Sequence, residues 1–298
     1  MTAFGPFTGT LQDAAGNRLV VGADGVTLVP ATPDPPPPGP ARDRRRIVWH
    51  YGWGGPSLDA WPVDVRAGVT HVTLAMCQSA AKGTGKLTDP PGANRAQVAQ
   101  LVAAGVGVTI GIGGAGDGGI TCNGDGTASQ LAASVLGIRD RLGVTGITWD
   151  LEGTPGGAWT TAAVLAASRA LVAAGLNVAI WSSLYGGRLA AWGAVAQGLG
   201  GDLAWWERGF YDFAEANDSR LTGIVTGDLD SMRRYVVRDD QLVASFAPVG
   251  STSKTPAAVA RAAYAAARKA RPAVGWSVWE DRSDAAATWA TTRALAVT

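Results

Sequence analysis

Hydrophobic and polar positions follow two alternating patterns along most of this chain. Short runs rich in Val, Ile, Leu and Trp are typical of strands, whereas longer Ala-rich stretches with apolar residues three or four positions apart are typical of helices. Strands are predicted at residues 47–53, 71–76, 106–111, 146–151, 177–182, 202–206, 242–246 and 273–279. Helix-like stretches separate the strands; examples are residues 95–104, 128–141, 161–174 and 256–270, and residues 285–295 close the chain.

Residues with strong conformational preferences mark the ends of several of these helices. Thr127 directly precedes one predicted helix, and Thr255 with Pro256 is typical of an N-cap followed by a first helical residue. Gly105 and Gly175 stand where two other helices should end, because glycine readily adopts the left-handed conformation that closes a helix.

The order of these elements predicts the fold class. Eight strands, each followed by a helix or a long loop, extend over about 250 residues, which is the usual size of a (β/α)8 barrel. We therefore expect an α/β protein in which residues 46–298 form one TIM barrel. A doubly wound open sheet is the alternative, but it needs an early phosphate-binding glycine turn. Only residues 111–116 offer such a turn, and they lead into Asp117 and more glycine rather than into a helix.

The chain before the barrel has a different composition. Short β-like runs at residues 8–11, 18–21 and 26–29 predict a small β-rich segment over residues 1–30. Residues 31–45 are a linker, first a semi-rigid polyproline spacer and then a basic run. Because so few residues cannot bury a core alone, we expect the β-rich segment to bind a partner, to form a homo-oligomer or to pack on the main domain.

The strand predicted at residues 146–151 carries the strongest functional signal. Its alternating faces are formed by Ile147, Trp149 and Leu151 on one side and by Thr148, Asp150 and Glu152 on the other. Carboxylates are costly to bury without a partner, so a strand that ends in two of them is typical of an active site. Because ionising both at close range costs energy, one pKa should rise, and a protonated Glu152 could act as a general acid. The alternative is an edge strand whose acids face water.

The active site of a (β/α)8 barrel lies at the carboxyl ends of its strands. Besides the two acids, the candidate substrate-binding residues at these ends are Tyr51, Trp53, Gly113, Gly114, Tyr185, Trp206, Glu207, Tyr211 and Trp279. The chain has 12 Trp residues, whose indole faces suit stacking on sugars, although most of them should be core residues. Glu207 and Glu280 are candidate second carboxylates, unless they pair with Arg208 and Arg282.

Other chemistries fit the sequence less well. The only histidines are His50 and His71, and no His-x-x-x-His or Cys-x-x-Cys spacing occurs, so we expect neither a metal nor a cofactor. No Gly-x-Ser-x-Gly motif supports a serine nucleophile. Cys77 and Cys122 could form one disulfide or remain two free thiols.

Charge and hydropathy exclude further classes of partner. The 25 Lys and Arg residues nearly balance the 24 Asp and Glu residues, and a net charge of +1 gives no electrostatic case for nucleic acid or an anionic membrane. No run of about 18 apolar residues could cross a bilayer. The first residues also lack the basic and apolar regions of a signal peptide.

The strand that ends in the two acids resembles a signature of family-18 glycoside hydrolases, the chitinase-like barrels. Asp150 and Glu152 match the end of the family's Asp-x-x-Asp-x-Asp-x-Glu motif, and Thr145 and Thr148 stand in place of its first two Asp. This last Asp and the Glu are the acids that the resemblance assigns to catalysis.

Three other strands extend this resemblance over residues 46–298. They are residues 71–75, residues 108–114, in which Gly111 replaces the Ser of a Ser-x-Gly-Gly motif, and residues 275–279, which end in Trp279. In the family, that final Trp forms the floor of the sugar site. The family's Met-x-Tyr-Asp element is not clear in residues 203–207, and Tyr211 lies four residues further on.

The resemblance implies retaining hydrolysis in which the substrate takes part. The 2-acetamido oxygen of an N-acetylglucosamine unit attacks the anomeric carbon, Glu152 protonates the leaving oxygen, and Asp150 holds the acetamido group. The polysaccharide would be chitin-like or a cell-wall glycan. Two alternatives remain open: a family-25-like muramidase, which also carries Asp-x-Glu on a barrel strand, and a carbohydrate-binding barrel without catalysis.

The layout of the chain also resembles that of phage tail proteins. A short β-rich segment, a polyproline spacer and a glycan-active barrel occur together in tail proteins of phages that infect actinobacteria, and the Ala, Gly, Arg and Val bias is typical of a GC-rich genome. We therefore expect a virion protein that acts outside the cell, with residues 1–30 binding other tail proteins. A secreted or a cytoplasmic protein is the alternative.

Overall fold

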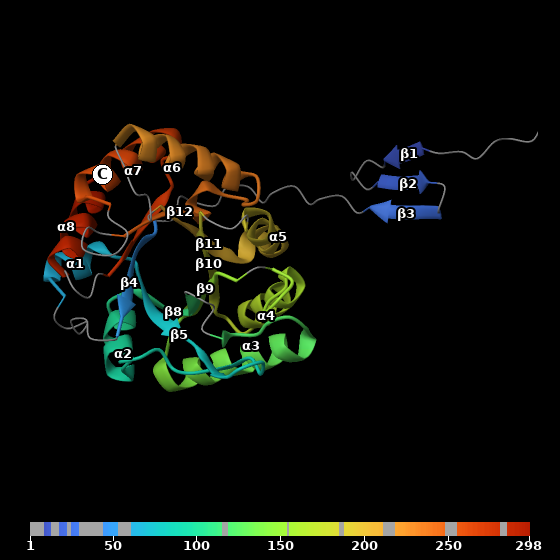
Figure 1. Cartoon of the computed structure of the whole chain (residues 1–298), viewed down its shortest axis with the longest axis horizontal. Coiled ribbons are helices and arrows are strands. Elements are labelled where there is room, and N and C mark those ends of the chain that lie inside the picture. The colour runs from blue at the N-terminus through green and yellow to red at the C-terminus, as the bar shows by residue number, and fades with distance from the viewer. Residues whose placement is uncertain are drawn as a thin grey trace, which may run out of the picture. The chain divides into compact units, whose positions relative to one another are not determined.

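The computed structural model describes residues 44–52, 61–114, 119–153, 155–184, 188–210, 218–247, 255–280 and 285–298, together with the backbone of three short strands that precede them. The chain forms two compact units, Met1–Pro40 and Ala41–Thr298. Figure 1 labels the helices and most of the strands of both units.

The first unit contains a three-stranded antiparallel sheet. Its strands are β1 (Gly9–Gln12), β2 (Arg18–Gly22) and β3 (Gly25–Val29), in that order across the sheet. β2 and β3 form a tight hairpin, in which Gly22 lies opposite Gly25. The sequence predicted each of these strands to within one residue of its observed ends.

The second unit contains a closed barrel of eight parallel strands, which confirms the (β/α)8 prediction and makes the open-sheet alternative wrong. The strands are β4 (Arg46–Tyr51), β5 (His71–Cys77), β8 (Gly107–Gly114), β9 (Gly146–Leu151), β10 (Asn177–Ser183), β11 (Leu203–Gly209), β12 (Leu242–Phe246) and β13 (Gly275–Trp279). β13 closes the barrel on β4, with Trp276 opposite Arg46 and Trp279 opposite Trp49.

Helices surround the barrel (Figure 1). They are α1 (Val63–Gly68), α2 (Arg95–Ala103), α3 (Asp125–Leu142), α4 (Thr161–Ala173), α5 (Leu189–Leu199), α6 (Asp218–Arg233), α7 (Ala257–Ala270) and α8 (Ala285–Ala296). A small antiparallel pair, β6 (Ser79–Ala81) and β7 (Lys86–Leu87), follows β5. The short 3-10 turns η3 (Gly200–Asp202) and η4 (Asp239–Gln241) lead into β11 and β12.

Three of these helices, α1, α5 and α6, were not among the examples that the sequence pattern singled out. Glycine lowers helix propensity, and α5 contains Gly193 and Gly198. Both glycines lie where another side chain packs closely. A Cβ on Gly193 would lie 2.6 Å from the ring of Tyr235, and a Cβ on Gly198 would lie 2.5 Å from Leu165. Close packing against these side chains therefore explains why α5 contains two glycines, which weaken its helical pattern.

The predicted helix ends are confirmed at two glycines and wrong at one threonine. Gly105 and Gly175 have φ angles of 80° and 82° directly after the caps of α2 and α4. Thr127 lies inside the first turn of α3, where its hydroxyl accepts a hydrogen bond from the N–H of Gly124 at 3.1 Å. The other predicted N-cap is shifted by one residue, because α7 begins after Pro256.

Alternation along the strands separates two layers of side chains. The inner cluster comprises Ile47, Trp49, Ala75, Met76, Ala179, Trp181, Ala204, Trp205, Val243, Ala247 and Trp279. The outer cluster lies between the strands and the helices, and Ile147, Trp149 and Leu151 of β9 belong to it. Because side chains fill the interior, a ligand can approach the barrel only at one of its ends.

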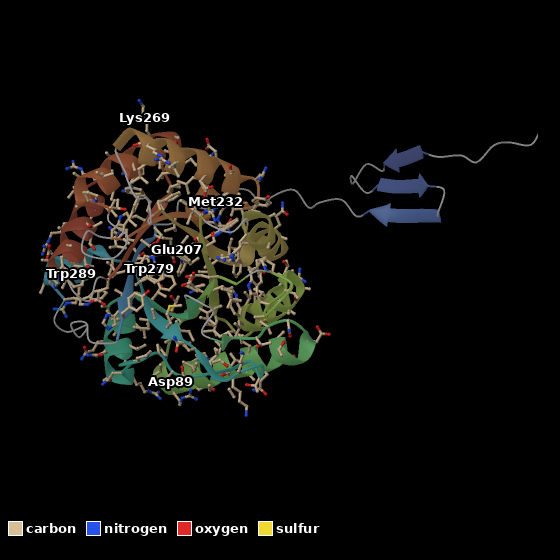
Figure 2. All side chains as sticks on the ribbon, in the orientation of Figure 1. Asp89, Glu207, Met232, Lys269, Trp279 and Trp289 are labelled. Atoms are coloured by element: carbon tan, nitrogen blue, oxygen red, sulfur yellow. The ribbon has the colours of Figure 1, made fainter. Side chains whose placement is uncertain are left out.

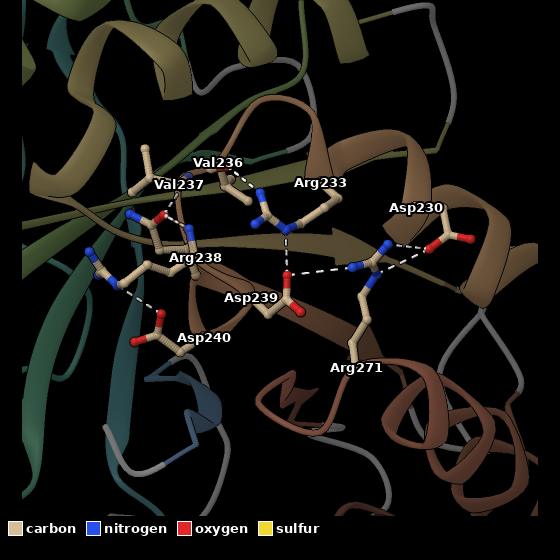
Figure 3. A network of polar contacts seen from close by, with 9 residues as sticks. Asp230, Arg233, Val236, Val237, Arg238, Asp239, Asp240 and Arg271 are labelled. Carbon is tan, nitrogen blue, oxygen red and sulfur yellow. Dashed lines mark hydrogen bonds and ion pairs between the residues drawn. The ribbon is translucent and has the colours of Figure 1, made fainter. Parts of the chain in front are cut away.

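A network of ion pairs lies where α6 and α7 end and β12 begins (Figure 3). Arg271 donates to Asp230 of α6 at 2.6 Å and to Asp239 of η4 at 3.4 Å. Asp239 also pairs with Arg233 at 2.5 Å. These contacts join two helix ends to the turn before a strand, at the end of the barrel away from the candidate acids.

Candidate active site

Asp150 and Glu152 lie at the carboxyl end of a central strand. β9 pairs with β8 on one side and with β10 on the other, and its six residues are all buried, so the edge-strand alternative is wrong. Trp149 points outward, where its indole N–H donates to Ser168 Oγ of α4 at 2.9 Å. Asp150 therefore faces the interior, and Glu152 follows directly after the strand ends.

The two acids differ in exposure. Asp150 is 1% exposed, whereas Glu152 is partly exposed. β8 approaches Asp150 through Gly113, which has a φ of 121°. A Cβ on Gly113 would lie 2.2 Å from the carbonyl oxygen of Asp150, so only glycine allows this approach. The arrangement encloses Asp150 and leaves Glu152 accessible to a ligand.

Trp279, the last residue of β13, lies among other aromatic rings. It stacks on Trp49, with ring centroids 4.2 Å and planes 13° apart. Trp181 meets it edge-on at 5.4 Å, and the ring of Tyr51 lies 5.5 Å away. The indole N–H of Trp279 donates to Ser245 Oγ at 3.1 Å. We call Trp49, Tyr51, Trp181 and Trp279 the aromatic floor.

Glu207, labelled in Figure 2, lies inside the barrel with no exposed surface. Its Oε2 accepts the indole N–H of Trp49 at 2.8 Å, and its Oε1 accepts that of Trp205 at 2.8 Å. Burial raises the pKa of Glu207 to about 7, and its hydrogen-bond donors offset this effect only in part. The alternative of an ion pair with Arg208 is wrong, because Arg208 pairs with Asp228 of α6 at 2.5 Å.

Glu280, directly after β13, is another enclosed carboxylate, 4% exposed. Its Oε2 lies 2.6 Å from His50 Nδ1 and accepts the backbone N–H of Tyr51 at 3.1 Å. The backbone N–H of Glu280 donates to the carbonyl oxygen of Trp49 at 2.9 Å. Glu280 therefore joins the carboxyl ends of the two strands that close the barrel. Arg282, its expected partner, lies outside the described residues.

The structure does not bring all of the predicted substrate-binding residues to the mouth. Gly114 ends β8 with a φ of 88° beside Met76. Trp206 is fully buried in the outer cluster, where its indole N–H donates to Ser182 Oγ at 2.8 Å. It faces the helices because neighbouring strand residues point to opposite sides, and Glu207 points inward. Trp53, Tyr185 and Tyr211 lie outside the described residues.

Sequence reasoning missed three residues of the aromatic floor and its support: Trp49, Trp181 and Ser245. Trp49 lies two residues before Tyr51 on the same strand, so alternation alone could have placed both rings on one face. Ser245 accepts indole N–H groups from both Trp279 and Trp181. A single serine in an apolar strand gives no signal of that role.

Thr145 and Thr148, which stand where two acids occur in the resembling motif, have structural partners. The Thr145 hydroxyl accepts the N–H of Val108 at 2.9 Å and donates to its carbonyl oxygen at 3.1 Å, which joins β9 to β8. Thr148 Oγ1 lies 3.2 Å from Thr109 Oγ1, which lies 2.9 Å from Thr73 Oγ1. We call Thr73, Thr109 and Thr148 the threonine chain.

Other ligand chemistries find little support in the part of the chain that the structure describes. No group of three or more His, Cys, Asp or Glu side chains there could hold a metal ion. Cys77 and Cys122 are both buried free thiols, and burial raises both pKa values, that of Cys122 to about 12. None of the described helices is long and apolar enough to cross a membrane.

A cavity of about 470 Å³ lies at the opposite end of the barrel from the two acids. It is lined where β4, β5 and β8 begin and by α1 and α2, with Arg46, Arg66, Thr70 and Gln100 among its polar residues. None of the predicted site residues lines it. The cavity is therefore separate from the candidate active site.

Comparison with known proteins adds a similarity of fold. No protein-family model matches the chain, and no curated protein matches its sequence. A family GH18 chitinase from Chromobacterium violaceum matches with a TM-score of 0.68 and 19% identity, over 97% of this chain and 95% of that chain. A putative Chitinase A from Streptomyces coelicolor has a TM-score of 0.67 and 17% identity, over 85% of this chain and 97% of that chain. The catalytic domain of a family GH18 chitinase from the fern Peteris ryukyuensis has a TM-score of 0.69 and 17% identity, over 83% of this chain and 97% of that chain. At these identities the chain shares the barrel fold of these chitinases.

Proposed function

We propose that this protein is a glycoside hydrolase of the chitinase type, which cleaves a polysaccharide that contains N-acetylglucosamine. One observation carries the proposal: the two acids and the aromatic floor come from opposite sides of one barrel mouth. In the closed strand order, β9 and β13 are four strands apart in either direction. Asp150 and Glu152 thus end the strand opposite Trp279, which suits a sugar ring stacked on the floor with its glycosidic bond toward the acids.

In the mechanism that we propose, the substrate supplies the nucleophile. The acetamido oxygen of the sugar attacks the anomeric carbon while Glu152 gives its proton to the leaving glycosidic oxygen. Asp150 binds the acetamido N–H and offsets the positive charge of the cyclic intermediate. Glu152, now a carboxylate, takes a proton from the water that opens this intermediate with retention. The exposure of Glu152 and the enclosure of Asp150 fit these two roles.

Three observations favour this mechanism over one with a carboxylate nucleophile on the enzyme. β12 carries no acid. Glu207 is fully enclosed, and both of its oxygens accept indole N–H groups. Glu280 has one oxygen held by His50 and the backbone of Tyr51.

Release assays on chitooligosaccharides and on peptidoglycan, with wild type and Glu152→Gln in parallel, test the proposal. We expect the wild type to release products with retained configuration, Glu152→Gln to abolish release, and Asp150→Asn to lower it strongly. Cleavage of peptidoglycan between muramic acid and glucosamine units alone would support a muramidase instead. Binding of oligosaccharide by wild type without release would support a carbohydrate-binding barrel, and release that survives Glu152→Gln would contradict the catalytic assignment.

We also propose that the first unit attaches the barrel to a larger assembly, as in a phage tail acting outside the cell. The separate compact unit Met1–Pro40 and its small sheet support this role. Removing residues 1–40 should leave barrel stability and hydrolysis unchanged and abolish incorporation into virions. A truncated chain that is still incorporated would contradict the proposal.

A further inference from the structure

Glu207 is a carboxylate in an unusual position, because it lies in a packed core and is fully buried. Enclosing a carboxylate has a large desolvation cost, and replacing such a group with an apolar side chain of similar volume often stabilises a protein. Its presence therefore indicates a role other than stability. Both oxygens hold the N–H of an indole, one from Trp49 and one from Trp205.

The two indoles lead to opposite ends of the barrel. Trp49 stacks on Trp279 of the aromatic floor at 4.2 Å. The ring of Trp205 instead lies 4.7 Å from His71, at the end where the strands begin. Glu207 thus touches the floor through one partner and the far end of the barrel through the other.

The Trp49 ring is also confined on the side that faces β8. A Cβ on Gly111 would lie 2.6 Å from its Cζ3 atom, so the ring fills the space that a side chain on β8 would need. The only polar atom of the ring is the indole nitrogen, and its N–H donates to Glu207. This hydrogen bond sets the orientation of the ring within the space.

We propose that Glu207 is a positioning residue of the sugar site, which anchors the Trp49 indole and thereby holds Trp279 in the orientation that a bound sugar ring needs. Glu207 itself touches no ligand, because no part of it is exposed. The identity of the ligand in this inference rests on the proposed function. The positioning rests on the hydrogen bond between Trp49 and Glu207 and on the stacking of Trp49 on Trp279.

Two variants with one matched control test the positioning. Glu207→Gln keeps the volume of the side chain but can accept only one of the two indole N–H groups. Trp49→Phe keeps a ring beneath Trp279 and removes the N–H. Trp205→Phe removes the other hydrogen bond of the same carboxylate at a ring that is not part of the floor. If Glu207→Gln does not fold, the pair of tryptophan variants still decides the question.

The first readout is the split between KM and kcat on a chitooligosaccharide. We expect KM to rise about tenfold in Glu207→Gln and in Trp49→Phe, a change of one decade in affinity, with kcat within about threefold of wild type because the acids on β9 are untouched. Trp205→Phe should leave KM near the wild-type value. Equal changes of KM in Trp49→Phe and Trp205→Phe, or a folded Glu207→Gln with wild-type KM, would overturn the proposal.

The second readout does not need activity. Two indoles stacked at 4.2 Å should give an exciton couplet in the circular dichroism spectrum, which Trp279→Phe identifies by removing it. We expect Glu207→Gln to shift or weaken this couplet while Trp205→Phe retains it. If wild type neither cleaves nor binds chitooligosaccharide, the proposed function fails, and an unchanged couplet in Glu207→Gln would separately overturn the positioning role.

Discussion

The barrel interior consists of one half filled by tryptophan and one half lined by small residues. The inward tryptophans are Trp49, Trp181, Trp205 and Trp279, from β4, β10, β11 and β13. On the other side, β8 and β9 contribute mainly threonine and glycine, and β5 contributes Thr73 and Ala75 together with the larger Met76. We call these two parts the tryptophan half and the small half. Eight strands enclose a limited volume, so large side chains on one side require small ones on the other.

The two halves also satisfy their polar groups differently. In the tryptophan half, indole N–H groups converge on the carboxylate of Glu207 and the hydroxyl of Ser245. In the small half, hydroxyls bond to one another in the threonine chain. The candidate acids lie at the carboxyl end of β9, which belongs to the small half. Trp279 of the aromatic floor lies at the carboxyl end of β13, which belongs to the tryptophan half. The contrast teaches that uneven filling of a barrel can give its mouth one acidic side and one flat apolar side.

Trp49→Ala should have the largest effect on this contrast. It removes a fully buried ring, leaves a cavity beside Gly111 and deprives Glu207 of a donor. We expect the free energy of unfolding, measured with urea, to fall by about 3–5 kcal/mol. Thr73→Ala is the control from the small half, and it should lose less because it removes only a hydroxyl and a methyl group. Equal losses from both variants would mean that the two halves carry similar shares of the packing.

The second prediction concerns pH, because the tryptophan half encloses Glu207. Burial raises its pKa from 4.5 to about 7, so the folded chain holds this proton more tightly than the unfolded chain. Stability from this group is therefore fully present below pH 4.5 and falls as pH rises to about 7, by roughly 3 kcal/mol in total. Unfolding free energies of wild type and Glu207→Gln, compared between pH 4.5 and 8, measure this slope.

The variant is needed as a reference because His71 acts in the opposite direction. Burial lowers the pKa of His71 to about 3, so its contribution is present above pH 6.5 and is lost as pH falls toward 3. Glu207→Gln retains His71, and subtracting the two curves isolates the carboxyl. A difference between the two proteins that does not change from pH 4.5 to 8 would contradict the raised pKa.

Strands were predictable from the sequence because their apolar runs are short and clearly bounded. β9 and β12 have the predicted bounds, and the other barrel strands differ from theirs by a few residues. Side-chain direction in β11 was not predictable, because the β10–β11 pairing shifts register between Val178 and Ala179. One extra residue reverses which positions face inward, and a sequence does not show such a shift. Trp206 was expected at the mouth because it lies toward the carboxyl end of its strand, but it and its neighbour Glu207 point to opposite faces, and Trp206 lies among the helices.

Gly111→Ala tests, from the small half, how tightly the rings of the tryptophan half are packed against it. The added Cβ would lie 2.6 Å from the Trp49 ring and 3.0 Å from Met76 Sδ, so one of these side chains must move. We expect a loss of about 1–3 kcal/mol in the free energy of unfolding. Gly126→Ala in α3 is the matched control, because a Cβ there meets nothing within 4 Å and alanine favours a helix. A Gly111→Ala protein as stable as wild type would show that the Trp49 ring is not confined.

Thr109→Val should have the smallest effect, and it separates volume from hydrogen bonding in the small half. Valine keeps the shape of the side chain but removes the hydroxyl at the centre of the threonine chain, so Thr73 and Thr148 both lose a partner. We expect the free energy of unfolding to fall by about 1–2 kcal/mol, because two buried hydrogen bonds are lost and each has a usual net value of about 1 kcal/mol. Thr109→Ser, which keeps the hydroxyl and loses a methyl group, is the reciprocal variant. If Thr109→Val is neutral and Thr109→Ser is destabilised, packing alone stabilises the small half. The opposite order would show that the small half depends on its hydroxyls.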